Sequence, residues 1–175
     1  MMMTDIGPAV RRLAACATLS LAICTPAAAD EQGPWVLTVF EDRAQGEELI
    51  AGDHARAMDV LGGKAGKPRT LEANNNLCVA YALAEDLGSA EEACGKALSA
   101  GARSFFWSGP SLQRRDRAVA YSNRGVVRAM AGDREGALSD FRRALELQGT
   151  LDAAVQNLAR LRSADAPLAA ATNVR

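Results

Sequence analysis

A 47-residue internal repeat is the feature that most constrains how this chain folds. Shifting the sequence by 47 positions superimposes mostly small and apolar residues. A fixed period of this length is typical of stacked structural repeats, in which each unit buries its apolar face against the next. The matching positions have the character of helix contacts, which predicts an all-α repeat protein. The superimposed pairs are Asn76 and Asn123, Cys78 and Gly125, Val79 and Val126, Asp86 and Asp133, Ala90 and Ala137, Cys94 and Phe141, Ala97 and Ala144, and Leu98 and Leu145.

The second copy of the repeat indicates a helical hairpin. Ala137, Phe141 and Ala144 follow the i, i+4, i+7 spacing of one helix face. Gly132 and Asp133 stand before them and supply a turn and an N-cap. Two helices joined at this turn are therefore predicted.

The clearest unit, 118–151, resembles the tetratricopeptide repeat, a 34-residue helix-turn-helix motif. The match rests on large and small residues at fixed positions, namely Tyr121, Gly125, Gly132, Ala137, Phe141 and Ala144. The chain departs from the motif at Gly149, where a proline is usual, and at Arg124 and Arg128, where apolar or aromatic residues are more common.

Aligning the rest of the chain with the tetratricopeptide repeat pattern divides it into further units. It gives a second unit over 71–104, a capping helix over 152–163 and a degenerate first hairpin from about residue 41 to 61. The resemblance thus implies a right-handed solenoid of about three helical hairpins over 41–163. Residues 30–40 are expected to be extended, chiefly over Trp35 to Phe40, and the tail 164–175 to be disordered.

The first 29 residues have the pattern of a secretory signal peptide. Arg11 and Arg12 precede an apolar run from Leu13 to Ile23, and small residues follow up to Ala29. No later stretch has the 18 or more consecutive apolar residues of a membrane-spanning helix. We therefore expect cleavage near Ala29, a periplasmic or secreted protein and no stable membrane insertion.

Cleavage there removes Cys16 and Cys24 and leaves Cys78 and Cys94 in an oxidising compartment. The family register implies that both face the interior of one hairpin, so we expect a disulfide between them. The alternative is a pair of buried thiols that serve as small apolar side chains.

The sequence does not match the patterns expected for catalysis, cofactor binding or nucleic-acid binding. The formal net charge is −1, with acidic and basic residues interleaved, so no basic surface for nucleic acid is expected. Gly62 to Lys67 lacks phosphate-loop spacing, and Pro68 stands where that motif needs Ser or Thr. His54 is the only histidine, and it is expected at a solvated helix start. We therefore expect no enzyme, no bound cofactor and no metal site.

The resemblance implies a binding groove, because in that family the first helices of the repeats line a concave surface that receives an extended peptide. Asn76, Asn123 and Asn157 share the sixth position of their units, and an amide offers both a donor and an acceptor to a peptide backbone. This row of three asparagines is here called the asparagine ladder. The alternative is that they are inherited consensus residues. The apolar residues expected beside the ladder are Val79, Val126 and Met130.

The sequence therefore predicts a protein–protein interaction module with a protein or peptide partner. The alternative is a structural component of an envelope or secretion assembly that uses its outer faces or adds strands at Trp35 to Phe40. An aromatic cluster, Phe105 to Trp107, lies in an expected loop from Arg103 to Arg117, where it either packs over a gap between repeats or forms a lip of the groove.

Overall fold

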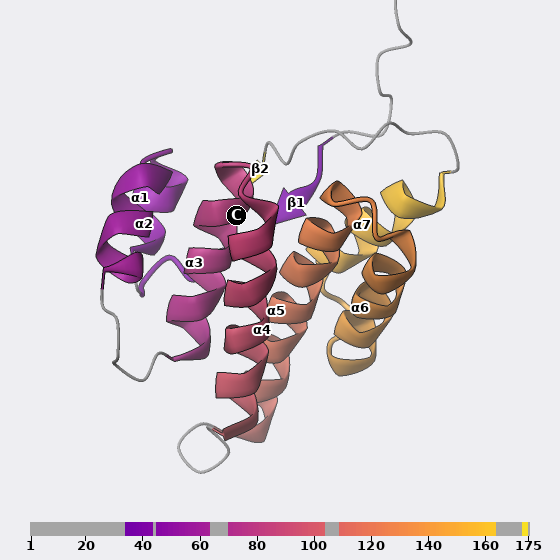
Figure 1. The fold of residues 1–175 in the computed structure, drawn as a ribbon. Helices are drawn as coiled ribbons and strands as arrows, with labels where there is room; N and C mark the ends of the chain where they lie inside the picture. The colour runs from indigo at the N-terminus through magenta and orange to yellow at the C-terminus, as the bar shows by residue number, and fades with distance from the viewer. Residues whose placement is uncertain (1–33, 44, 64–69, 104–108, 164–172, 175) are drawn as a thin grey trace, which may run out of the picture.

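The computed structural model describes residues 34–43, 45–63, 70–103, 109–163 and 173–174, and over these residues the protein is helical (Figure 1). The prediction of an all-α chain is confirmed there. Its elements in chain order are β1 (Val36–Leu37), α1 (Gly46–Ile50), α2 (His54–Gly62), α3 (Leu71–Leu83), α4 (Leu87–Arg103), α5 (Pro110–Met130), α6 (Arg134–Leu147), α7 (Asp152–Arg162) and β2 (Asn173–Val174).

Each helix packs against the next one in the chain. The most extensive contacts join α3 to α4 and α5 to α6, the two hairpins that the sequence predicts best. Helix α5 also contacts α3 and α7, so α3, α5 and α7 form a row along one side of the molecule. The side chains on this side of the row therefore face one common surface.

Short polar side chains cap the start of three of these helices, α2, α3 and α6. The Asp133 carboxylate accepts a hydrogen bond from the Gly136 N–H at 2.9 Å, and Asp53 caps α2 in the same way. Gly132 precedes the first of these caps with a φ of 85°, a conformation that glycine adopts without steric cost. The turn and N-cap predicted at Gly132 and Asp133 are therefore confirmed.

The connection between the two best units is more helical than predicted. Helix α4 runs to Arg103 and α5 begins at Pro110, so the expected loop is wrong for residues 110–117. Proline is favourable here because its fixed φ suits the first turn, in which its missing N–H has no intrahelical partner. The aromatic residues Phe105 to Trp107 lie outside the described residues.

The main core lies between the helices and the extended segment near the N-terminus. Trp35, Leu37 and Phe141 are among its largest fully buried side chains. Gly125 of α5 lets the Phe141 ring approach the helix backbone, because a Cβ at this glycine would stand 2.6 Å from Phe141 Cε1. This close approach explains why α5 carries a glycine, the smallest residue, opposite the large Phe141 side chain of α6.

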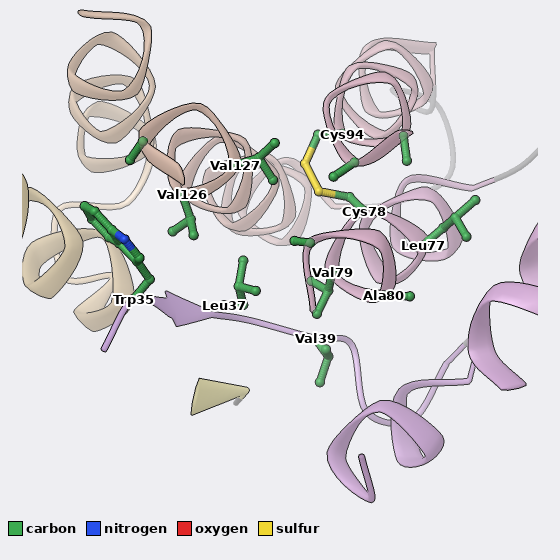
Figure 2. Packing of buried hydrophobic residues seen from close by; sticks show 14 of the residues in the cluster. Trp35, Leu37, Val39, Leu77, Cys78, Val79, Ala80, Cys94, Val126 and Val127 are labelled. Carbon is green, nitrogen blue, oxygen red and sulfur yellow. A yellow bond between two sulfur atoms is a disulfide. The ribbon is translucent and has the colours of Figure 1, made fainter. Parts of the chain in front are cut away.

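Cys78 of α3 and Cys94 of α4 lie at disulfide distance, as the sequence predicts (Figure 2). Their Cα atoms are 5.2 Å apart, and both residues are fully buried. The bond would link the two helices of one hairpin at its core.

The two arginines that depart from the repeat pattern pair with buried or partly buried acids. Arg124 donates two hydrogen bonds to the Asp140 carboxylate, at 2.8 and 2.7 Å, and these bonds hold the pKa of Arg124 above its ordinary value. Arg128 bridges Asp140 on α6 and Glu91 on α4. Charge pairing across three helices thus replaces the apolar contact expected at these positions.

The predicted signal peptide, residues 1–29, lies outside the described residues. Most of the tail does too, but Asn173 and Val174 form strand β2, so the expectation of disorder is wrong for these two residues. Among the described helices, none is long and apolar enough to cross a membrane.

Candidate functional site

An extended segment, residues 35–40, crosses the row formed by α7, α5 and α3. It contains β1 and is here called the N-terminal segment. Figure 2 shows it running past α5 toward α3, with Trp35 at one end and Val39 at the other. The segment meets the helices in the reverse of their chain order, from α7 to α5 to α3.

The asparagine ladder binds the backbone of this segment. The Oδ1 atoms of Asn157, Asn123 and Asn76 each accept a hydrogen bond at 2.9 Å, from the backbone N–H groups of Val36, Thr38 and Phe40 respectively. The Nδ2 atoms of the same three side chains donate to the carbonyl oxygens of the same residues, at 2.8, 2.7 and 3.0 Å. Each asparagine therefore binds both backbone groups of one residue, and each step along the ladder advances the segment by two residues.

Further amide contacts support the ladder at its α3 end. Asn75 donates to the Thr38 carbonyl at 3.0 Å and accepts a hydrogen bond from Asn123 Nδ2 at 2.9 Å. Asn76 also donates to the carbonyl of Arg43, at 2.8 Å, where the chain turns toward α1. Sequence reasoning missed Asn75, although it stands in the Asn74–Asn76 run beside a ladder position.

Alternate side chains of the segment enter the core. Trp35, Leu37 and Val39 are 1%, 0% and 6% exposed. Figure 2 shows Val126 and Val79, both fully buried, pointing toward them from α5 and α3. Met130 is partly buried and packs against the same core.

Trp35 lies at the α7 end of the N-terminal segment. Its ring is stacked on Phe141 with 6.2 Å between centroids, and the Arg160 guanidinium lies 4.9 Å from the indole centroid. Cations attract the negative face of an aromatic ring, and indole is the best partner among the side chains. The buried Trp35 Nε1 has no hydrogen-bond acceptor in the described structure.

The other edge of the segment faces β2. Val36 and Leu37 pair in parallel with Asn173 and Val174. Because the backbone groups of successive strand residues point to opposite edges, the residues between the ladder contacts present their N–H and C=O groups on this second edge. One edge is bound by side-chain amides and the other by a short strand.

All the site residues named from sequence lie on helices of the row that the segment crosses, namely Asn76, Asn123, Asn157, Val79, Val126 and Met130. All three ladder asparagines are at most 1% exposed, because the N-terminal segment covers them. Substitution there must affect stability as well as binding.

The described residues hold no cluster of three or more His, Cys, Asp or Glu side chains suited to a metal ion. A cavity of about 650 Å³ lies between α5 and α6, and Arg124, Arg128 and Asp140 are among the residues that line it. Most of its charged groups pair with one another. Asp140 pairs with Arg124 and Arg128, and Glu146 pairs with Arg143. The asparagine ladder is therefore the strongest candidate site.

Comparison with protein-family models, with curated proteins and with solved structures found no match to this chain.

Proposed function

We propose that the protein is an exported protein–protein interaction module of tetratricopeptide type, whose concave groove binds an extended polypeptide through the asparagine ladder. The observation that carries the proposal is the pairing of three asparagines with both backbone groups of Val36, Thr38 and Phe40. The N-terminal segment is then an example of the ligand that the groove accepts.

The ladder suits a polypeptide of varied sequence. Its hydrogen bonds go to main-chain groups, which every residue except proline offers in full. Asparagine contributes a donor and an acceptor on one short side chain, so it can bind the N–H and C=O that point to the same strand edge. The family resemblance, the helix row and the buried Val79 and Val126 support the same role.

A partner would have to replace the N-terminal segment. A short connection gives a tethered segment an effective concentration of about the millimolar range, so a free ligand starts at a disadvantage. Only residues 41–45 separate the segment from α1. Exchange is therefore expected to favour partners that fit the groove better or are held close to it.

Cutting this connection gives a direct test. A protease site inserted between the exposed residues Glu41 and Asp42, then cleaved, turns the segment into a dissociable ligand. A fluorescent peptide with the sequence of residues 34–41 should exchange into the cleaved protein, as read by anisotropy.

The matched control is the same peptide with N-methyl groups on the residues equivalent to Val36, Thr38 and Phe40, which keeps every side chain and removes the three donors. It should bind at least roughly tenfold more weakly, because each lost hydrogen bond costs about 0.5 to 1.5 kcal/mol. Equal binding of the two peptides would contradict recognition by the ladder.

The parallel pairing of β2 with β1 favours a second candidate function, in which the protein is a structural component of an envelope or secretion assembly that adds a partner strand to the outer edge of β1. Val39→Pro removes a donor from that edge, and Thr38→Pro removes one from the ladder edge. Each variant is used to capture partners from the envelope fraction. If the partner binds by strand addition, the Val39→Pro variant should lose it and the Thr38→Pro variant should retain it.

A further inference from the structure

The groove differs along its length in what it demands of a bound segment. At the ladder, it contacts only main-chain groups, so these contacts are alike for different sequences. At Trp35, it surrounds a large side chain that is 1% exposed. Selectivity among extended segments must therefore come from the positions whose side chains are buried.

The pocket that holds Trp35 is built for an aromatic ring. Phe141 offers a stacked aromatic face, with 23° between the ring planes, and Arg160 places a cation 4.9 Å from the indole centroid. Trp35 Nε1 is buried and no acceptor reaches it in the described part of the chain. The pocket thus contacts the ring and makes no use of the indole N–H.

The next buried positions on the same face are two and four residues further on. Leu37 and Val39 belong to the same core cluster as Val126 and Val79, and Figure 2 shows Leu37 pointing toward these two valines. Val36 is also buried, at 3% exposed, whereas Thr38 and Phe40 are only partly buried. An extended chain places side chains i, i+2 and i+4 on one face, which gives the spacing of an aromatic residue followed by two aliphatic ones.

We propose that the partner of this groove is an extended polypeptide segment with an aromatic residue at the Trp35 position and aliphatic residues two and four positions later, bound with its N-terminal end at α7. Residues 35–39 are a built-in copy of this segment and compete with the partner for the groove. The inference rests on the proposed binding function and adds the sequence and the direction of the ligand.

The test varies the ligand and leaves the protein unchanged. Labelled peptides of residues 34–41 are bound to the protein cleaved between Glu41 and Asp42, and their Kd values are compared with that of the native peptide. A Trp35→Phe peptide should bind within about tenfold, because it keeps the ring and sheds a buried donor without an acceptor. A Trp35→Ala peptide should bind roughly a hundredfold more weakly, as expected when a large buried aromatic side chain is removed.

Two further peptides control for composition and direction. A Thr38→Lys peptide changes a partly exposed position and should bind within about threefold of the native one, as surface changes usually have small effects. A peptide with the native residues in reversed order should show no binding that the native peptide can compete away.

The outcomes separate the two proposals. If the native peptide binds and the Trp35→Ala peptide binds equally well, the aromatic selectivity is wrong and the binding function stands. If the native peptide does not bind a cleaved protein that keeps its helical circular dichroism, both are wrong.

If cleavage unfolds the protein, the uncleaved Trp35→Ala variant replaces it, because its own segment is a weakened competitor. It should bind the native peptide at least roughly tenfold more tightly than the wild-type chain does. No gain in affinity would overturn the proposal.

Discussion

Asn157 of the last described helix binds Val36 near the start of the described chain, with Oδ1 accepting from the Val36 N–H at 2.9 Å and Nδ2 donating to the Val36 carbonyl at 2.8 Å. The two residues are 121 positions apart, and both are buried. The contact joins the last helix of the row to the N-terminal segment, so the stability of the fold is linked to the seating of this segment.

Asn157→Ala should lower the free energy of unfolding by at least about 2 kcal/mol. The change leaves a buried N–H and a buried C=O without partners, and each unsatisfied group costs about 1 to 3 kcal/mol. Urea denaturation followed by circular dichroism measures the loss. Gln156→Ala, an exposed neighbour on α7, is the matched control and should change stability by less than about 0.5 kcal/mol. Equal effects of the two variants would contradict a structural role for the ladder.

Gly125→Ala should destabilise the protein by about 1 to 3 kcal/mol, because the new methyl group would stand 2.6 Å from the Phe141 ring in a packed core. Gly95→Ala in α4 is the control, since a Cβ there would meet nothing within 4 Å. That change should stabilise the helix by about 0.5 to 1 kcal/mol. Thermal unfolding of both variants decides the point, and a Gly125→Ala protein as stable as wild type would show that Phe141 can move aside.

Purified protein from an oxidising compartment should contain the Cys78–Cys94 disulfide. Alkylation of the denatured, unreduced protein followed by mass spectrometry should find neither cysteine modified. Replacing both with alanine should cost about 3 kcal/mol by the chain-entropy model for a loop of 16 residues. Two alkylated cysteines before reduction would instead support the buried-thiol alternative.

Asp116→Asn should stabilise the protein at neutral pH and have little effect in acid. Burial raises the Asp116 pKa above its ordinary value, repulsion from Glu72 adds to this, and Arg115 and Arg43 oppose it. A carboxyl group with a raised folded-state pKa favours folding while it is protonated, and that contribution is lost as the pH rises through the folded pKa. Urea titrations at about pH 7 and about pH 3 measure the difference. Asp59→Asn, an exposed change in α2, controls for the loss of one charge, and an equal gain from both variants at neutral pH would refute the assignment.

Much of the fold could be predicted because helix contacts leave a periodic record in the sequence. The matches at Ala90 and Ala137, and at Leu98 and Leu145, mark pairs of equivalent helix positions, and Asp133 marks a helix start. The start of α5 was missed because Pro110 is compatible with both a loop and a first helical turn. The Arg124–Asp140 pair was missed because the two charges lie on different helices, 16 residues apart, and nothing local relates them.

The occupant of the ladder could not be deduced from the asparagines alone. They bind backbone groups, and every residue except proline has both of these groups, so the binding leaves no sequence pattern in the segment. The row of Asn76, Asn123 and Asn157 was nevertheless visible at equivalent positions, and so was the extended character of Trp35 to Phe40. An apolar extended segment needs partners for its backbone, and joining these two observations would have indicated the contact.

The reversed order in which the N-terminal segment meets the helices also affects how the chain assembles. Residues 35–40 emerge early in synthesis, whereas Asn157 emerges late, so the Trp35 end of the segment must wait for nearly the whole domain before its backbone is paired. Helices α3 to α6 can pack through local contacts before then. Seating of the segment is thus expected to be completed late in folding, and a chain that stops before α7 would leave the apolar Trp35 end of the strand unpaired, a feature that promotes aggregation.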